Sequence, residues 1–178
     1  MSTEVTVSDS MGNSKNTSQF VGFRLLDQEY VFPIGQIQEI VILDRVTRMP
    51  QVADYVEGVS NLRGTIIPVI NLRLLFGLES RPADDETRTI VVNVGTRTMG
   101  CTVDAVTQVI RIPVDDIQPA PDIIAGEGTP WIDGFAKIDD RLLIVLDINE
   151  LLDPAKLDQV RDAVKSAGMT STSVPQAD

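Results

Sequence analysis

Residues 58 to 76 read Gly-Val-Ser-Asn-Leu-Arg-Gly-Thr-Ile-Ile-Pro-Val-Ile-Asn-Leu-Arg-Leu-Leu-Phe. The apolar, β-branched run from Thr65 to Ile70 predicts a strand, and residues 72–76 predict a helical turn that closes the unit. Pro68 predicts an edge position or a bend in that strand. One charged side chain, Arg63, lies in the glycine-flanked turn before the strand.

The apolar pattern of this stretch returns later in the chain. A shift of 76 residues places it on Gly134 to Leu152, where the apolar positions recur but the Asn-Leu-Arg-Gly turn does not. The aligned turn, residues 137–140, reads Lys-Ile-Asp-Asp. We therefore predict that the shared pattern is scaffold and that the turn found only in the first copy is a candidate for function.

The segment upstream of Gly58 also recurs, at a shift of 69 residues. Alternation at residues 21–25 and 30–34 predicts a hairpin, and it matches residues 90–94 and 99–103. Between this hairpin and Gly58 we predict three further elements: a helical turn at Ile37 and Ile40, a strand over 41–47 and a short helix over 52–57. The common order of elements favours an internal duplication, with a fortuitous match as the alternative.

The predicted fold is mainly β, with two pseudo-repeated five-stranded β-barrels that share an interface. We place the first barrel mostly in residues 19–77 and the second mostly in 88–152. Asp153 and Pro154 predict the start of a C-terminal helix over 154–167, with the apolar stripe Leu157, Val160 and Val164, and Gly168 at its end. Within the folded region 19–168, short helical turns complete the unit. The polar residues 1–18 and 169–178 predict disordered tails.

Composition excludes several classes of function. The chain has 178 residues, a net charge of −11 and a pI near 4.4, which argues against nucleic-acid binding and against docking on an anionic membrane. It has no histidine and a single cysteine, Cys101, so it lacks the usual catalytic triads and zinc sites, and we expect no metal and no cofactor. No apolar run of about 18 residues is present, and a reducing cytosol is the expected compartment.

Paired barrels also occur in enzymes, and an acid hydrolase with two aspartates is the alternative to a binding module. The candidates are Asp104 and Asp147, but neither is in an Asp-Thr/Ser-Gly turn. Their counterparts in the first copy are Gly35 and Asn71, so the two carboxylates are not at equivalent positions. A binding or adaptor module without catalysis is therefore the favoured prediction.

A polar set in the first copy remains as a candidate site. We predict that Arg63 and Glu39 flank an apolar groove between the barrels, lined by Ile37, Val106 and Val109. The alternative is a surface ion pair without function.

The segment Gly58 to Arg73 resembles the signature of the CheW family of chemotaxis coupling proteins. The resemblance extends through Glu29-Tyr30, Ile37-Gln38-Glu39-Ile40, Val46-Thr47-Arg48 and Ile117-Gln118-Pro119-Ala120-Pro121, and it covers about residues 19–153. It implies two intertwined SH3-like barrels and no catalysis. A CheW-like protein bridges the cytoplasmic hairpin tips of methyl-accepting chemoreceptors to the regulatory domain of the histidine kinase CheA.

The resemblance also implies site residues and a location. Receptor contact would fall on Ile37, Glu39, Gly58, Arg63, Val106, Val109 and Gly134. Kinase contact would fall on Ile42 and Val46. Such a protein is cytoplasmic, is recruited to membrane receptor arrays without inserting into the membrane, and is a monomer in isolation that can self-associate in rings. A coupling protein of another chemosensory pathway, such as twitching or gliding, is the alternative in the same fold.

Overall fold

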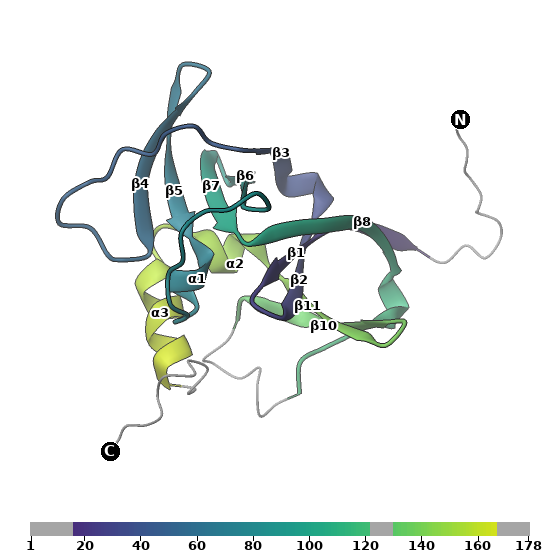
Figure 1. Cartoon of the computed structure of the whole chain (residues 1–178). Helices are drawn as coiled ribbons and strands as arrows, with labels where there is room; N and C mark the ends of the chain where they lie inside the picture. The colour runs from purple at the N-terminus through teal and green to yellow at the C-terminus, as the bar shows by residue number, and fades with distance from the viewer. Residues whose placement is uncertain (1–15, 122–129, 167–178) are drawn as a thin grey trace.

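The computed structural model describes residues 16–121 and 130–166, and it is mainly β (Figure 1). The strands of the first half, with the turns that follow them, are β1 (Thr17–Leu25), β2 (Gln28–Pro33), η2 (Ile34–Gln36), β3 (Ile37–Val41), β4 (Val56–Leu62), β5 (Thr65–Asn71) and α1 (Leu72–Leu75). Those of the second half are β6 (Arg88–Val94), β7 (Arg97–Val103), β8 (Ala105–Pro113), η3 (Val114–Asp116), β9 (Ile117–Gln118), β10 (Ile132–Ile138), β11 (Arg141–Leu146) and α2 (Ile148–Leu152). The helix α3 (Leu157–Ser166) follows.

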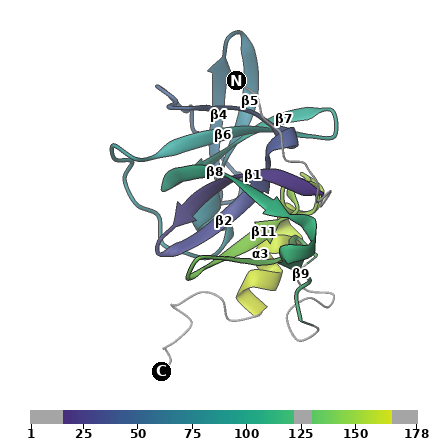
Figure 2. The same ribbon diagram turned by 90° about the vertical axis from the view of Figure 1, so that its right-hand side faces the viewer.

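The strands form two barrel-like sheets, and the chain passes between them twice. One sheet has six strands in the order β8-β1-β2-β11-β10-β9, and the other has five in the order β3-β6-β7-β5-β4. Figure 2 shows β8, β1, β2 and β11 following one another across the six-stranded sheet. The five-stranded sheet is thus built from residues 37–103, and the six-stranded sheet from 17–33 and 105–146.

This arrangement corrects the predicted division into a barrel over 19–77 and a barrel over 88–152. The hairpins β1–β2 and β6–β7 have exchanged partners, so each lies in the sheet of the other half. Parallel pairing joins β2 to β11 and β5 to β7, and each of these pairs connects strands far apart in the sequence. A pattern of alternation locates strands but not their partners, and the exchange is therefore invisible to it.

The internal duplication is visible in matching details. The two hairpins have the same register, with Leu25 opposite Gln28 in one and Val94 opposite Arg97 in the other. Asn71 and Asp147 occupy equivalent N-cap positions, and their side chains accept hydrogen bonds from the first turns of α1 and α2. The predicted helical turn over residues 72–76 is confirmed by α1.

The buried side chains form two clusters. The smaller one fills the interior of the six-stranded sheet and consists of Phe20, Val31, Ile110, Ile112, Ala136, Leu143 and Val145. The larger one lies between the sheets and under the helices, and it draws Phe23 and Phe32 from one sheet and Ile90 and Cys101 from the other. Because this cluster belongs to both sheets, neither can bury its apolar surface alone. Cys101 is fully buried, and burial raises the pKa of its thiol.

Three predicted local structures are wrong. Residues 37–41 form strand β3, not a helical turn. The strand predicted over residues 41–47 is replaced by a loop, in which Thr47 makes an isolated bridge to Val59. Residues 56 and 57 begin β4, so the short helix predicted over 52–57 is absent. Pro68 is on β5, which is an internal strand and not an edge strand. It precedes the residues of β5 that pair with β7, so its missing N–H removes no hydrogen bond between these two strands.

The ends of the folded region differ slightly from the prediction. Strand β1 begins at Thr17, inside the segment predicted as a tail, and the helix α3 begins at Leu157, not at residue 154. The Asp153 carboxylate accepts a hydrogen bond from the Ala155 N–H, so it caps the turn that precedes the helix. Residues 1–15 and 167–178, which include most of both predicted tails and Gly168, lie outside the described residues, as does the side chain of Val164.

The first half of α3 packs on the shared core. Leu157 and Val160 are buried in the larger cluster, as the predicted stripe requires. The Asp158 carboxylate accepts a hydrogen bond from the Tyr55 hydroxyl at 2.5 Å, and Arg161 forms a forked ion pair with Asp54. No helix in the described part of the chain is long and apolar enough to cross a membrane.

Gly58 gives a direct test of the close approach of β4 to the preceding loop. A Cβ atom at this position would lie 1.9 Å from the Thr47 carbonyl oxygen, and the backbone φ is +147°. We expect Gly58→Ala to lower the free energy of unfolding by about 3 kcal/mol or more, measured by urea denaturation.

Gly35→Ala is the matched control, because no atom lies within 4 Å of the added Cβ. It should change the free energy of unfolding by less than about 0.5 kcal/mol. Equal stability of the two variants would contradict the steric account of Gly58.

Candidate functional site

Arg63 lies at the tip of the hairpin formed by β4 and β5. Leu62 pairs with Thr65, so the turn has two residues, Arg63 and Gly64, with φ angles of 55° and 91°. Positive φ at both positions is typical of a type I′ turn, which favours Asn or Gly. The Asn61 side chain supports the turn by accepting a hydrogen bond from the Gly64 N–H at 2.7 Å. The aligned residue of the second half, Asp139, has a φ of 56°, so the fold sets this conformation in both halves, whereas the arginine is found only in the first.

The guanidinium of Arg63 is paired with Glu39 on β3. Two hydrogen bonds join the groups, from Nη1 to Oε2 and from Nη2 to Oε1. The hydrogen bond from Arg63 lowers the pKa of the Glu39 carboxyl below its ordinary value. The side chain of Arg63 is 66% exposed and that of Glu39 22%, so the pair lies at the surface and the arginine faces solvent.

The apolar residues predicted around this pair lie on two strands with the same geometry. Ile37 on β3 is opposite Val92, and Val106 on β8 is opposite Phe23. Each of these strand pairs contains a β-bulge. Because of the bulge, two residues that are three apart in the sequence lie on the same face of the strand: Ile37 and Ile40 on β3, and Val106 and Val109 on β8.

These residues do not have equal exposure. Ile37 and Val106 are half-buried and pack against the shared core from opposite sheets. Val109 is 56% exposed. The candidate surface is therefore divided: Ile37, Glu39 and Arg63 belong to the five-stranded sheet, and Val106 and Val109 to the six-stranded sheet.

Gly58 and Gly134, the remaining residues of the predicted receptor site, are both buried. They lie at equivalent β-bulges, at the pairs of β4 with β5 and of β10 with β11. A Cβ atom on Gly134 would lie 2.5 Å from the Gln118 carbonyl oxygen, and that on Gly58 would meet Thr47. Each glycine thus makes room for a neighbouring strand, which gives both a role in packing.

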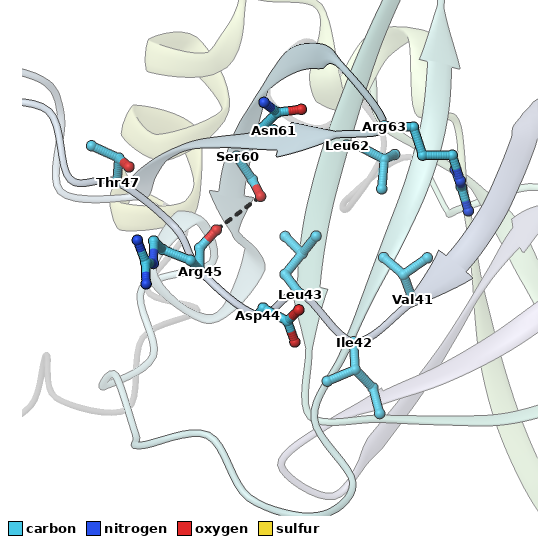
Figure 3. Close-up of a pocket in the computed structure, with 10 residues that line it drawn as sticks. All are labelled: Val41, Ile42, Leu43, Asp44, Arg45, Thr47, Ser60, Asn61, Leu62 and Arg63. Carbon is cyan, nitrogen blue, oxygen red and sulfur yellow. Dashed lines mark hydrogen bonds between the residues drawn. The ribbon is translucent and has the colours of Figure 1, made fainter.

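A cavity of about 380 Å³ opens beside Arg63 (Figure 3). It is lined by Val41, Ile42, Leu43, Asp44, Arg45, Thr47, Ser60, Asn61, Leu62 and Arg63. The cavity has a physical cause in the ending of β3 at Val41. The counterpart of β3 in the other sheet, β8, continues to Pro113. The segment that follows is held in the same way in both halves, by Thr47 opposite Val59 here and Gln118 opposite Phe135 there, and a 2.9 Å hydrogen bond from the Ser60 hydroxyl to the Arg45 carbonyl adds to it here.

Of the two residues predicted for kinase contact, Ile42 lines this cavity and Val46 does not. Ile42 is 67% exposed, and Val46 is half-buried between the lining residues Arg45 and Thr47. Ile42 and Arg63 therefore share one depression, although they were assigned to different partners.

The two candidate aspartates of a hydrolase are both engaged in structural contacts. Asp104 is 5% exposed and makes a forked ion pair with Arg73. Burial acts to raise the pKa of Asp104, but the hydrogen bonds from Arg73 and from the Leu26 N–H outweigh it and lower that pKa. Asp147 caps α2 through the N–H groups of Asn149 and Glu150. Neither carboxylate is placed as the acid of a shared dyad.

Arg73 is a residue whose importance the sequence analysis missed. It is 7% exposed and lies in the helical turn α1 among Leu72, Leu74 and Leu75. A charged side chain in an apolar run requires a partner when it is buried, and this was the available signal. The signal gives no indication of which carboxylate is the partner.

The comparisons with known proteins agree with this geometry. The family model described as "CheW-like domain" matches residues 19–156. The chain belongs to the CheW-like family. A chemotaxis protein CheW of Klebsiella aerogenes is 36% identical over 148 residues, which are 83% of this chain and 89% of that protein. One of Helicobacter pylori is 37% identical, with coverage of 84% and 90%.

A solved CheW-like structure has the same fold. The scaffolding protein TtCheW of Thermoanaerobacter tengcongensis superposes with a TM-score of 0.71 at 33% identity and covers 78% of this chain and 94% of its own. A more distant relative, protein PilI of Pseudomonas aeruginosa, is 31% identical over 114 residues, 64% of each protein.

The turn at Arg63 predicts a conflict between stability and function. Asn adopts positive φ more readily than Arg, so Arg63→Asn should leave the melting temperature unchanged or raise it, although the ion pair with Glu39 is lost. Differential scanning calorimetry of the variant and of wild type tests this. A clear fall in melting temperature would show that the ion pair, not the turn, dominates local stability.

Proposed function

We propose that this protein is a non-catalytic adaptor that couples chemoreceptor signalling tips to the histidine kinase CheA. The observation that carries the proposal is the Arg63–Glu39 pair, displayed on an unfavourable turn in a chain of the CheW-like family. The aligned turn in the second half of the chain has no arginine, so the fold does not require one there. A residue that the fold does not need, in a conformation that it disfavours, is best explained by a partner.

The receptor contact is proposed for the surface around this pair. Glu39 occupies two of the N–H donors of Arg63, and the forked guanidinium has three more that can reach a carboxylate or carbonyl of the partner. The half-buried Ile37 and Val106 and the exposed Val109 supply apolar surface of the kind that accepts an amphipathic helix. We assign Gly58 and Gly134 to this site indirectly, because each allows a neighbouring segment to approach its strand closely.

The kinase contact is proposed for Ile42 and Val46. Ile42 is among the most exposed large apolar side chains, and such residues are typical of protein–protein interfaces when they border a hollow. Both residues belong to the loop after β3, so this contact is confined to the five-stranded side of the molecule. Ile42 and Arg63 line the same cavity, and the two partners would therefore meet next to each other.

The proposed adaptor acts in the cytoplasm, where receptor arrays recruit it without insertion into the membrane. It is monomeric in isolation and associates in rings with the regulatory domain of the kinase or with its own copies. Its contribution is binding alone, with no metal, cofactor or bond-making step.

Charge reversal tests the receptor contact. Arg63→Glu places a carboxylate opposite Glu39, and we expect at least a tenfold loss of affinity for a receptor signalling fragment, since like charges at an interface oppose binding strongly. Binding to CheA should fall much less than binding to the receptor, because Ile42 and Val46 are unchanged and Arg63 only borders their cavity. Isothermal titration with each partner separates the two effects.

The reversed pair, Glu39→Arg with Arg63→Glu, is the control for this experiment. It restores the ion pair but presents a carboxylate from the turn, so receptor binding should remain weak. If the reversed pair binds the receptor as wild type does, the ion pair itself matters and Arg63 makes no direct contact.

A second test uses the exposed apolar residue on the other sheet. Val109→Met enlarges a side chain that is 56% exposed, so the free energy of unfolding should change by less than about 0.5 kcal/mol. The longer side chain should hinder receptor docking, measured by co-sedimentation with receptor-containing membranes. Normal docking by this variant would place the receptor away from β8.

The likeness to protein PilI supports a second candidate, a coupling protein of another chemosensory pathway, such as one for twitching or gliding. The site chemistry is the same for both candidates. Deletion of the gene followed by swimming and twitching assays separates them, since each pathway controls one type of movement.

A further inference from the structure

A buried ion pair holds the place where the chain passes from the five-stranded to the six-stranded sheet. Asp104 is the single residue between β7 and β8. Its Oδ1 accepts a hydrogen bond from Nε of Arg73 at 2.7 Å, and its Oδ2 accepts one from Nη2 at 2.8 Å. The two side chains are 6% and 8% exposed, so this is a desolvated, forked contact of the strong kind.

The same carboxylate also reaches the hairpin of the other sheet. Its Oδ2 accepts a hydrogen bond at 2.9 Å from the N–H of Leu26, in the turn between β1 and β2. The backbone N–H of Asp104 donates to the carbonyl of Arg24 at 3.1 Å. Arg73 in turn donates to the carbonyl of Glu79 at 2.8 Å. The pair therefore ties α1, which follows β5 of one sheet, to the β1–β2 hairpin of the other.

The other crossing, from β2 to β3, has a much weaker contact at the equivalent place. There η2 leads from β2 to β3, and the Gln36 amide donates a hydrogen bond at 3.0 Å to the side chain of Asn149 on α2. Asn149 is the duplicated counterpart of Arg73, and it is exposed. One crossing is thus fixed by buried charges and the other by a solvated, neutral hydrogen bond.

Both crossings lead directly into the proposed receptor surface. Asp104 is two residues before Val106 and five before Val109, and Gln36 directly precedes Ile37 on β3. A rotation of one sheet against the other would move Val106 and Val109 relative to Glu39 and Arg63. It would leave Ile42 and Val46 in place relative to Arg63, because their loop joins two strands of the five-stranded sheet.

We infer that the Arg73–Asp104 pair is a positioning element that fixes the six-stranded sheet against the five-stranded sheet and so keeps the two parts of the receptor-binding surface in register. The inference rests on the proposed function for its receptor contact. Arg73 and Asp104 touch no partner and act through the strand β8. In this role the pair selects one inter-sheet geometry, as buried polar groups do in some proteins.

The decisive variant replaces the pair by apolar side chains of similar size, Arg73→Met with Asp104→Leu. Such a replacement of a buried ion pair is often neutral for stability, while it removes the directional contacts. The exposed turn at Leu26 can give its N–H to water. The matched control is Arg161→Met with Asp54→Leu, which removes another forked Arg–Asp pair, between α3 and the segment before β4, away from both crossings.

Binding is measured by titration with a receptor signalling fragment and with CheA, using the full chain. We expect the Arg73/Asp104 double variant to lose about tenfold in receptor affinity and to keep its CheA affinity within about twofold. The control variant should keep both affinities within about twofold. Arg73→Lys, which keeps the charge but loses the fork, should have an intermediate receptor affinity.

A distance measurement gives a readout that does not depend on any partner. Spin labels on cysteines introduced at the exposed Gln38 and Gln108 report the separation of β3 and β8, and the native Cys101 is buried. The distribution should broaden in the Arg73/Asp104 double variant and stay narrow in the control.

An unchanged distribution overturns the positioning role whatever the partner is. A broadened distribution with unchanged receptor affinity, or a parallel fall in both affinities, overturns its link to receptor binding. If wild type binds neither the receptor fragment nor CheA, the proposed function fails, and the distance measurement still decides the role of the pair in the fold.

Discussion

Two parallel strand pairs, β5 with β7 and β2 with β11, determine the architecture of this protein. Each pair joins strands from different halves of the chain, and every other feature depends on this exchange. Because the hairpins β1–β2 and β6–β7 lie in each other's sheet, the larger apolar cluster is shared and the molecule has one main core. The exchange also creates the two crossings, and the strands that leave them, β3 and β8, carry Ile37, Glu39, Val106 and Val109 of the candidate receptor surface.

Comparison of the two halves separates scaffold from function more sharply than either half alone. Positions that hold the frame recur with the same role, as do the N-caps Asn71 and Asp147 and the bulge glycines Gly58 and Gly134. The positions that differ are Arg63, Glu39 and the end of β3, which opens the cavity. An adaptor for two different partners needs this asymmetry, because a symmetric pair of barrels would present the same surface twice.

The sequence predicted the two repeated hairpins, the strand over residues 65–70 and the helical turn at residues 72–76, because period-2 alternation and turn residues are local signals. The ion pair between Arg63 and Glu39 was the alternative without function, and the structure contains this pair. Prediction from the sequence failed where two structures give the same spacing. Ile37 and Ile40 are three apart, which suggested a helical turn, but a β-bulge also brings such residues to one face. Gly58 suggested the end of a helix, whereas it makes room for Thr47. The partners of the hairpins and the pairing of Arg73 with Asp104 are long-range facts, and no local pattern contains them.

Along the chain, the strands of the five-stranded sheet lie between two groups of strands of the six-stranded sheet, and this order has a consequence during synthesis. Residues 37–103 emerge from the ribosome as one continuous stretch, so the five-stranded sheet has all its strands early. The β1–β2 hairpin is made first but waits for β8, β10 and β11, which at typical elongation rates takes about ten seconds. For that time both of its edges are unpaired, and an unpaired edge is a template for association with other chains. The hairpin therefore remains open to such association until β8 and β11 pair with its two edges.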